Sequence, residues 1–346
     1  MIKKVAILTL TKGSYDLGKK LKRKLVNYEV SLYGLEKNVE FIEENYLNQQ
    51  FKEGFAAIFS EYDAMICVMA TGIVVRHLAS LVQDKRHDPA VVVMDEKGKF
   101  AISLLSGHIG GGNELTNDIA NTIGAQPVIT TATDVQNVTA IDLMAKSLNG
   151  WYQDFKKTTK HVNYLLATHK KVALFDEENR VTDLRGLELI NTLETKEVTN
   201  FEAVIVVSTK QRLDLASNCF QVVPKEFVLG MGAKRDTPYN VIKEEFSIFC
   251  DLHNIHPQSI KQIVSIDLKK DEQGIIAFSN ELAVPFDTYT KEELEPSSLK
   301  YPQSDFVKSV VGIGNVALSS ADYATNGKVL TERYGHNGVT FALGKG

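Results

Sequence analysis

Cysteine is scarce in this sequence. Only three cysteines occur among 346 residues, and they are far apart and form no C-x-x-C pair: Cys67, Cys219 and Cys250. An odd number of widely spaced cysteines argues against a disulfide framework and against a thiolate zinc site. The scarcity is typical of a protein that folds in the reducing cytoplasm, where we expect this chain to reside.

The sequence also lacks a long apolar run and an excess of positive charge. No apolar stretch approaches the ~20 residues needed to cross a membrane. The run at residues 5–10 has no cleavage site after it and is interpreted as a buried strand. The 39 basic and 43 acidic residues give a formal charge of -4, so no positive field is available to hold nucleic acid. An anionic ligand has to be met by local basic side chains.

Apolar runs alternate with segments of helical periodicity along most of the chain. Leu17, Leu21 and Leu25 recur at helical spacing after the first apolar run. A second run at residues 64–69 is followed by helical spacing over residues 73–82. Strands that alternate with helices predict a multidomain α/β fold of mainly parallel, layered sheets with helices on both faces.

The composition predicts three domains. Residues 1–136 form an amino-terminal α/β domain with the main glycine-rich motifs, and residues 137–223, rich in lysine and glutamate, form a small middle domain. Residues 224–346 form a carboxyl-terminal α/β domain. Within it, further apolar segments lie at residues 263–268, 274–282, 306–311 and 339–343.

The first candidate site is the sequence SLLSGHIGGGNELTNDIA at residues 103–120. An apolar strand ends there, a loop with four glycines follows, and a helix begins near Asn113. The start of a helix exposes backbone N–H groups that favour a negative oxygen. His108 is the only side chain of the loop that exchanges protons near pH 7, and Glu114 is expected to orient it or to act as a base. A purely structural turn and a zinc-ligand role for His108 are the alternatives.

The second candidate site follows a buried strand that ends at residue 69. Thr71 and the backbone of Gly72 are expected at the carboxyl edge of the sheet, where parallel sheets bind their ligands. Arg76 and Lys85 are candidates for holding carboxylates, because a guanidinium pairs with a carboxylate through two N–H bonds. A solvated helix face and loop are the alternative. We expect this segment to share one edge of the sheet with the first candidate site.

Two further glycine turns lie in the last third of the chain. The sequence VLGMGAKRDTP places Gly232, Lys234 and Arg235 where an anionic ligand can reach them, with a solvated basic turn as the alternative. The sequence VVGIGNVA at residues 310–317 matches the dinucleotide fingerprint G-x-G-x-x-G/A. Too little chain follows it for a complete dinucleotide-binding half.

A long stretch resembles the CbiG family, the cobalt-precorrin-5A hydrolases of anaerobic cobalamin biosynthesis: MATGIVVRHLASLVQDKRHDPAVVVMDEKGKFAISLLSGHIGGGNELTNDIA, followed by PVITTATD. The resemblance is strong over residues 64–134 and moderate over residues 226–343. The family usually has a cysteine where this chain has Ala233 and a glutamate where it has Leu318. Neither position therefore receives a catalytic role here.

The resemblance implies a hydrolase that opens the δ-lactone on ring A of cobalt-precorrin-5A and releases a two-carbon unit as acetaldehyde, giving cobalt-precorrin-5B. It implies no metal or cofactor held by the protein, because the cobalt belongs to the substrate. Lactone opening needs a base for water and donors for the oxyanion. His108, with Glu114, is expected to supply the base, and the backbone of the glycine loop the donors. The residues expected to bind substrate are Thr71, Gly72, Arg76, Lys85, Ser106, Gly107, Gly110, Gly111, Gly112, Asn113, Gly232, Lys234 and Arg235.

Two other functions stay open at this level. A carrier that hands tetrapyrroles between methyltransferases needs the basic, glycine-rich segments but has no use for His108 as a proton-transfer group. A nucleotide-dependent enzyme needs the turn at residues 312–317. The partner expected from the resemblance is a cobalt-precorrin small molecule. Transient contact with corrinoid methyltransferases and a homodimer are compatible with the sequence, and we expect binding to neither nucleic acid nor a membrane.

Overall fold

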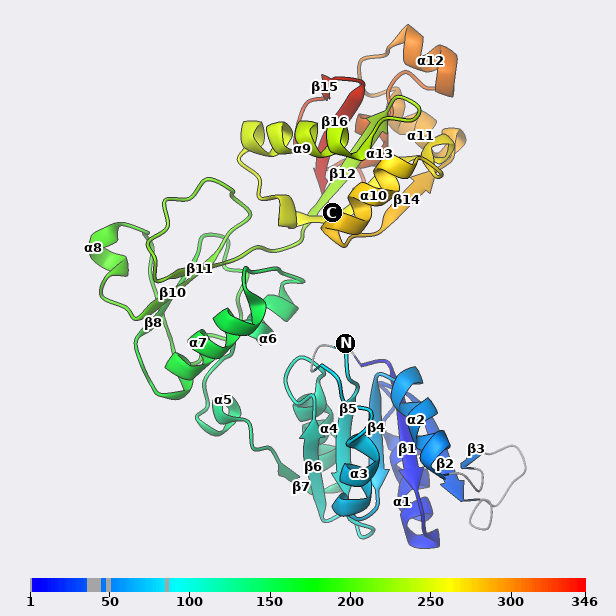
Figure 1. The fold of residues 1–346 in the computed structure, drawn as a ribbon, viewed down its shortest axis with the longest axis vertical. Helices are drawn as coiled ribbons and strands as arrows, with labels where there is room; N and C mark the ends of the chain where they lie inside the picture. Colours follow the sequence, from blue (N-terminus) through cyan, green and yellow to red (C-terminus); the bar gives the residue numbers. More distant parts are fainter. Residues whose placement is uncertain (1, 36–44, 48–50, 85–86) are drawn as a thin grey trace. The chain divides into compact units, whose positions relative to one another are not determined.

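The computed structural model describes residues 2–35, 45–47, 51–84 and 87–346. The chain forms two compact units, Met1–Leu143 and Met144–Gly346 (Figure 1). One sheet lies in the first unit and two lie in the second. A further domain boundary between the two sheets of the second unit stays a prediction. Across the described ranges, every helix is too short or too polar to cross a membrane.

The first unit is built on a seven-stranded sheet of order β3-β2-β1-β4-β5-β6-β7. Its strands are β1 Lys4–Thr9, β2 Glu29–Leu35, β3 Asn45–Leu47, β4 Ala64–Val68, β5 Ala90–Met94, β6 Phe100–Leu105 and β7 Gln126–Val128. Its helices are α1 Lys12–Lys24, α2 Phe51–Glu61, α3 Thr71–Leu78, α4 Gly112–Ile123 and α5 Ala132–Val135, and α6 Ile141–Ser147 spans the boundary to the second unit.

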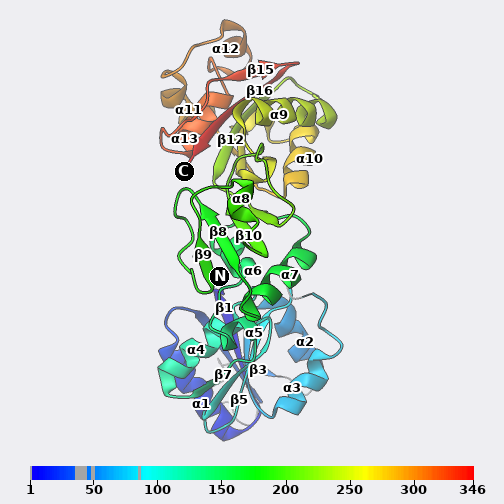
Figure 2. The ribbon, with the colours of Figure 1, turned by 90° about the vertical axis from the view of Figure 1, so that its left-hand side faces the viewer.

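Both faces of this sheet are covered by helices. Side chains alternate along β1, so that Val5 and Ile7 join one core while Ala6 and Leu8 join the other. The first core includes residues of α1 and α4, and the second includes residues of α2 and α3. Figure 2 shows these helix pairs on opposite sides of the sheet. The predicted layered α/β architecture is confirmed.

One step in the sheet is antiparallel. Strands β1 to β5 run parallel, β6 runs antiparallel to β5, and β7 runs parallel to β6. The connection between β5 and β6 is a tight turn in which the Asp95 carboxylate accepts hydrogen bonds from the N–H groups of Lys97 (2.9 Å) and Phe100 (2.8 Å). Gly98 supplies the left-handed residue of the turn, with φ of 66°. So short a connection reverses the chain, because a parallel pair needs a crossover of a dozen residues or more.

The second unit holds a four-stranded sheet of order β11-β10-β8-β9 and a five-stranded sheet of order β14-β13-β12-β16-β15. Its strands are β8 Val172–Asp176, β9 Leu187–Leu189, β10 Ala203–Val207, β11 Cys219–Val222, β12 Phe227–Ala233, β13 Ile260–Ile266, β14 Phe286–Tyr289, β15 Tyr334–His336 and β16 Val339–Lys345. Its helices are α7 Phe155–Ala167, α8 Thr195–Val198, α9 Tyr239–His253, α10 Gln273–Leu282, α11 Lys291–Ser298, α12 Asp305–Val311 and α13 Ala317–Ala324, with short 3-10 turns at Pro257–Ser259 and Asp267–Lys269.

The five-stranded sheet is also covered on both faces. Phe246, Phe249 and Phe278 of α9 and α10 pack with β12 in one core. Ala317 and Ala321 of α13 belong to a separate cluster on the other face. Figure 2 shows α9 and α10 on one side of β12 and β16, and α11 and α13 on the other.

Two apolar segments of this unit, at residues 274–282 and 306–311, form the helices α10 and α12. The buried residues Ile275, Phe278 and Leu282 of α10 are spaced by three and four positions, which is helical rather than alternating. Helix α12 begins at Ser304, whose side chain caps it, and ends at Gly312 in the left-handed conformation. Both end signals are visible in the sequence.

Candidate functional site

The loop between β6 and α4 is held in one conformation by its own backbone. Ser106 adopts a left-handed φ of 52°, and its hydroxyl donates to the carbonyl oxygen of Asp88 (3.0 Å). A side chain at Gly110 would place its Cβ 2.5 Å from the carbonyl oxygen of Ser106. Gly111, with φ of 84°, caps the start of α4. Glycine is therefore needed in this loop for chain packing and conformation, independently of any ligand.

Two of the backbone N–H groups predicted to bind the oxyanion already donate hydrogen bonds within the loop. The N–H of Gly111 donates to the carbonyl oxygen of His108 (2.9 Å), and the N–H of Gly112 donates to that of Ser106 (3.1 Å). A backbone N–H that closes a loop in this way is not available to a substrate oxygen without a change in the loop. The oxyanion role expected for the amides of Gly110, Gly111 and Gly112 stays a prediction, and for Gly111 and Gly112 it requires the loop to open.

His108 lies between two carboxylates. Its Nε2 is 2.9 Å from Oδ2 of Asp134 and 3.0 Å from Oγ1 of Thr133, and its Nδ1 is 3.8 Å from Oδ2 of Asp142. These partners come from α5 and α6, which follow β7. The His108 side chain is 13% exposed, that of Asp134 is 31% exposed and that of Asp142 is buried. Solvent and small molecules thus reach the pair mainly from the Asp134 side.

The two carboxylates favour the protonated form of the imidazole. Burial of the ring disfavours that form, but the hydrogen bonds and negative charges of Asp142 and Asp134 outweigh burial and raise the pKa of His108. The raised pKa suits His108 to act as a proton donor, and the role of base expected from the sequence stays a prediction.

Asn113 completes the cluster. Its Nδ2 donates to Oδ2 of Asp134 (2.9 Å) and to Oγ1 of Thr131 (3.1 Å). A Cβ on Gly107 would lie 2.6 Å from Oδ1 of Asn113, so this position admits only glycine without a shift of Asn113. The same Oδ1 is buried and accepts no hydrogen bond from any residue that the structure describes. A buried acceptor without a partner is rare, and this one lies against Gly107.

The structure brings Asp134 and Asp142, rather than Glu114, to His108. Glu114 is exposed on α4. Its charge acts on Tyr28 instead: burial, the hydrogen bond to Asp118 and the charges of Asp118 and Glu114 together raise the pKa of Tyr28. The prediction that Glu114 orients His108 is wrong. The sequence prediction missed both true partners, although Asp134 ends the PVITTATD stretch already singled out.

The two amino-terminal candidate segments lie at opposite ends of the strands of the first sheet. Val68, at the end of β4, pairs with Met94 at the end of β5. Because β6 runs the other way, its end at Leu105 pairs with Val91 near the start of β5. The prediction that both segments share one edge is therefore wrong, and His108 is separated from the residue 70–76 segment by the length of a strand.

The residue 70–76 segment forms the start of α3. Thr71 and Gly72 are exposed, and Nη1 of Arg76 donates to the carbonyl oxygen of Gly72 (3.2 Å). His77 packs its ring against Phe51 and Phe55, with centroids 4.9 and 5.3 Å apart, and so lies on the face of α3 that contacts α2. Lys85 lies outside the described residues. In this segment, exposed Arg76 thus stays a candidate for binding carboxylates.

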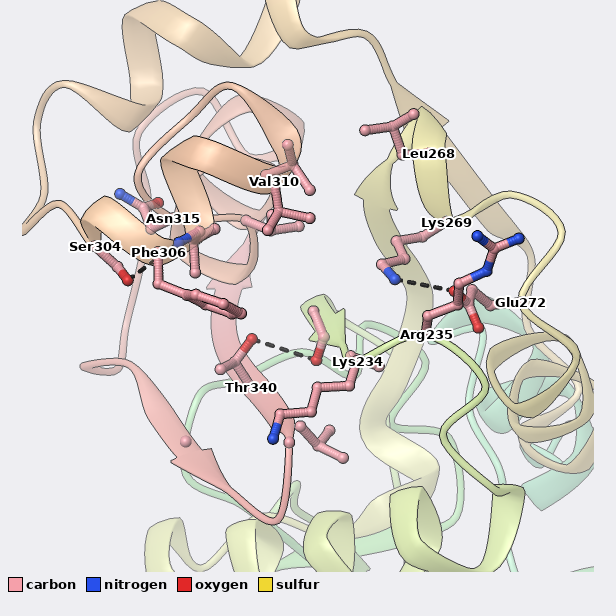
Figure 3. A pocket seen from close by; sticks show the side chains of 18 of the residues that line it. Lys234, Arg235, Leu268, Lys269, Glu272, Ser304, Phe306, Val310, Asn315 and Thr340 are labelled. Atoms are coloured by element: carbon pink, nitrogen blue, oxygen red, sulfur yellow. Dashed lines mark hydrogen bonds and ion pairs between the residues drawn. The ribbon is translucent and has the colours of Figure 1, made fainter.

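A pocket of about 850 Å³ opens at the carboxyl end of β12 (Figure 3). Gly232, Lys234 and Arg235 line it, so the structure brings these three predicted residues together. Figure 3 shows Phe306 and Val310 of α12 on one side and Arg235 on the other. The pocket thus combines an apolar wall with cationic side chains, a lining suited to a ligand that carries both apolar surface and acidic groups.

The GIGN turn is not a dinucleotide motif. The fingerprint requires a strand before its glycines, whereas Gly312 follows helix α12. Asn315 precedes helix α13, and its Oδ1 accepts a hydrogen bond from the N–H of Ser319 in the first turn (3.0 Å). The dinucleotide interpretation is wrong. Elsewhere too, the described part of the chain contains no group of three or more His, Cys, Asp or Glu side chains placed to hold a metal ion.

The raised pKa of His108 predicts a pH dependence of stability. A group whose pKa rises on folding contributes stability that is fully present below its unfolded pKa of ~6.5 and is lost as the pH rises through the folded value. We therefore expect His108→Gln to lower the free energy of unfolding more at pH ~5.5 than at pH ~9. Urea unfolding of both proteins at the two pH values measures this difference. A loss that is larger at the higher pH would contradict the ion pairs.

Comparison with known proteins gives consistent matches along the chain. Three family models match: Cobalamin synthesis G N-terminal over residues 53–134, Cobalamin biosynthesis central region over residues 139–224, and Cobalamin synthesis G C-terminus over residues 227–344. A Salmonella typhimurium protein named cobalt-precorrin-5A hydrolase is 38% identical over 350 residues, which cover 98% of this chain and 97% of that protein. A Priestia megaterium protein of the same name is 29% identical, with 91% and 87% covered.

Solved structures from cobalamin biosynthesis are also similar. A cobalamin biosynthesis protein G homolog from Sulfolobus solfataricus has a TM-score of 0.43 and 19% identity, and the match covers 99% of this chain and 97% of that one. CobE, a protein from the cobalamin pathway, has a TM-score of 0.33 and 19% identity, and the match covers 35% of this chain and 91% of that one.

Proposed function

Because this chain belongs to the cobalt-precorrin-5A hydrolase family of cobalamin biosynthesis, we propose that it opens the ring-A δ-lactone of cobalt-precorrin-5A with water and releases acetaldehyde, giving cobalt-precorrin-5B. The observation that carries the proposal is the 38% identity to the Salmonella typhimurium hydrolase over almost the full length of both chains. Cobalt takes part as a component of the substrate, and we propose that the protein adds no metal or cofactor of its own.

The cluster around His108 suits the lactone-opening step. When water adds to the lactone carbonyl, the partly exposed carboxylate of Asp134 accepts the water's proton. The carbon–oxygen bond then breaks. The protonated ring of His108 donates to the departing oxygen, which becomes a hydroxyl. Asp142 holds the ring in place and keeps it charged.

The basic side chains have a separate part in this proposal. The macrocycle carries several carboxylates, and a guanidinium or ammonium next to one of them contributes to binding rather than to bond breaking. Lys234 and Arg235 line the pocket of the second unit, and Arg76 is exposed on the first. We assign all three to substrate binding.

The direct experiment is incubation of the protein with cobalt-precorrin-5A under anaerobic conditions. We expect one water to be consumed for each lactone opened, as followed by mass spectrometry, and trapped acetaldehyde to appear in equal amount. Treating the protein with a chelator before substrate is added tests whether it needs a resident metal. Substrate that binds and is recovered unchanged would contradict the proposal and would favour a carrier.

Arg76→Ala is expected to leave kcat unchanged and to raise KM. Arg76 lies at the sheet edge opposite His108, so its loss removes a hold on a carboxylate and no proton transfer. Arg76→Lys is the matched variant, because it keeps the charge and loses the paired N–H geometry. Steady-state kinetics separate the two constants. A fall in kcat of about tenfold or more would place Arg76 in the chemistry instead.

We further propose that the reaction takes place in the cytoplasm and that the protein meets corrinoid methyltransferases only transiently, as partners that supply its substrate or take up its product. A homodimer is part of the same proposal. Sedimentation of the purified chain over a range of concentrations tests it, since a monomer at all concentrations would exclude a stable dimer.

A further inference from the structure

A buried carboxylate contacts two of the residues that line the pocket of the second unit. Glu245, on α9, is 1% exposed. Three donors surround it: the hydroxyl of Tyr334 at 2.5 Å, Nδ2 of Asn337 at 2.7 Å and Nδ1 of His336 at 2.9 Å. The hydrogen bonds from Tyr334 and His336 hold the pKa of Glu245 below its usual range despite burial. Glu245 is therefore an ionised group whose oxygens point at the turn between β15 and β16.

This arrangement fixes the tautomer of His336. A carboxylate can only accept, so Nδ1 of His336 carries the hydrogen, and Nε2 is left as the acceptor in the neutral ring. The His336 side chain is 63% exposed and lines the pocket. An imidazole that lines a pocket and is oriented by a buried carboxylate is the arrangement of a general base.

The turn that follows His336, between β15 and β16, is hydrogen-bonded to the basic turn at Lys234 and Arg235. The N–H of Lys234 donates to the carbonyl oxygen of Gly338 (2.8 Å), and a Cβ on Gly338 would lie 2.9 Å from Cδ of Lys234. The Lys234 side chain therefore runs along the same turn as His336. Arg333 and the apolar side chains of α12 also line the pocket. A base, cations and an apolar wall meet in a volume that fits a small-molecule ligand.

The two histidine sites differ in their electrostatics. His108 has a carboxylate near each nitrogen, which raises its pKa and suits donation to a departing oxygen. Among the residues that the structure describes, His336 has a carboxylate at Nδ1 alone, which suits removal of a proton by Nε2. The proposed reaction needs both functions, because lactone opening creates a hydroxyl that has to lose its proton before acetaldehyde can leave.

We propose that this pocket is a second proton-transfer site, in which His336, positioned by Glu245, acts on the ring-opened macrocycle. The inference rests on the proposed function and assigns His336 to the step after lactone opening. Nε2 takes the hydroxyl proton, the oxygen forms the carbonyl of acetaldehyde, and the carbon–carbon bond to the macrocycle breaks. The electron pair of that bond stays on the macrocycle, whose carbon takes up a proton, so no oxidant or reductant is needed.

The experiment follows both steps in the full chain with cobalt-precorrin-5A under anaerobic conditions. The variants are His336→Gln and Glu245→Gln, with His161→Gln, an exposed histidine on α7, as the matched control. For His336→Gln we expect lactone opening at the wild-type rate, accumulation of the ring-opened acid, and acetaldehyde release lowered by roughly 10²–10⁴-fold. Glu245→Gln should show the same pattern to a smaller degree, and Glu245→Asp should restore part of the rate.

Wild-type acetaldehyde release by His336→Gln would overturn the inference and leave the proposed function intact. An equal loss of both steps would also overturn it, because that result means a role in folding or in the first step, and thermal unfolding of the variant tells these apart. Absence of lactone opening by the wild-type chain would instead remove the proposed function itself. The two failures are therefore distinguishable in one set of assays.

Discussion

Replacing His108 by alanine is expected to lower kcat for lactone opening by roughly 10²–10⁴-fold, the usual worth of a positioned proton donor. The substitution removes the charged ring and leaves the carboxylates of Asp134 and Asp142 facing each other without a cation. KM should change little, because the ring is 13% exposed and offers little surface for binding. Single-turnover mass spectrometry of the lactone measures the step directly.

Two further variants make this prediction specific. Asp134→Asn keeps the hydrogen bonding of the site but lowers its ability to accept a proton, so it should lose rate without losing the fold. His161→Ala is the control, since His161 is an exposed residue of the second unit. Turnover of His108→Ala close to wild type would show that His108 has only a structural role, in which it holds α5 and α6 next to the glycine loop.

The second large effect is expected in the core of the second unit. A Cβ at Gly230 of β12 would lie 2.0 Å from the carbonyl oxygen of Ala317 and 2.8 Å from the N atom of Ala321. Both are backbone atoms of α13, so no side-chain rotation relieves the clash. Gly230→Ala is therefore expected to cost ~3 kcal/mol or more, at the upper end of overpacking effects, or to prevent folding. Urea unfolding followed by circular dichroism measures the loss.

Gly335→Ala is the matched control for this variant. Gly335 lies on β15 of the same sheet, and the nearest atoms to its added Cβ are 3.5 Å away, which is an ordinary contact. We expect its free energy of unfolding to stay within ~0.5 kcal/mol of wild type. An unfolding midpoint of Gly230→Ala at the same urea concentration as wild type would contradict the close contact of α13 with β12.

Most of the architecture could be predicted from periodicity, but one turn decided the position of the site. The apolar runs at β4, β5 and β6 were visible, and so was the charged turn at residues 95–99. Five residues cannot make the crossover that a parallel neighbour requires, so this turn already specified a hairpin. The prediction of a common site assumed that β6 is parallel to β5, and therefore placed the His108 loop at the wrong end of the strands.

The partners of His108 could not be read from the sequence. Asp134 and Asp142 are 26 and 34 positions away from it, and they reach it only because the chain passes through α4 and β7 and returns. No local pattern records such a return. The same holds for His336 and Glu245, which are separated by 91 positions and belong to different elements. The residue types were visible, whereas their pairing depended on the tertiary fold.

The antiparallel step in the first sheet has a practical consequence for the study of this protein. Because β7 runs opposite to β1, the chain leaves this sheet at the edge where it entered. The beginning of the chain is therefore close to the His108 loop, and a Cβ on Gly111 would be only 3.1 Å from the side chain of Ile2. An affinity tag or fusion partner added ahead of Ile2 would emerge next to the loop.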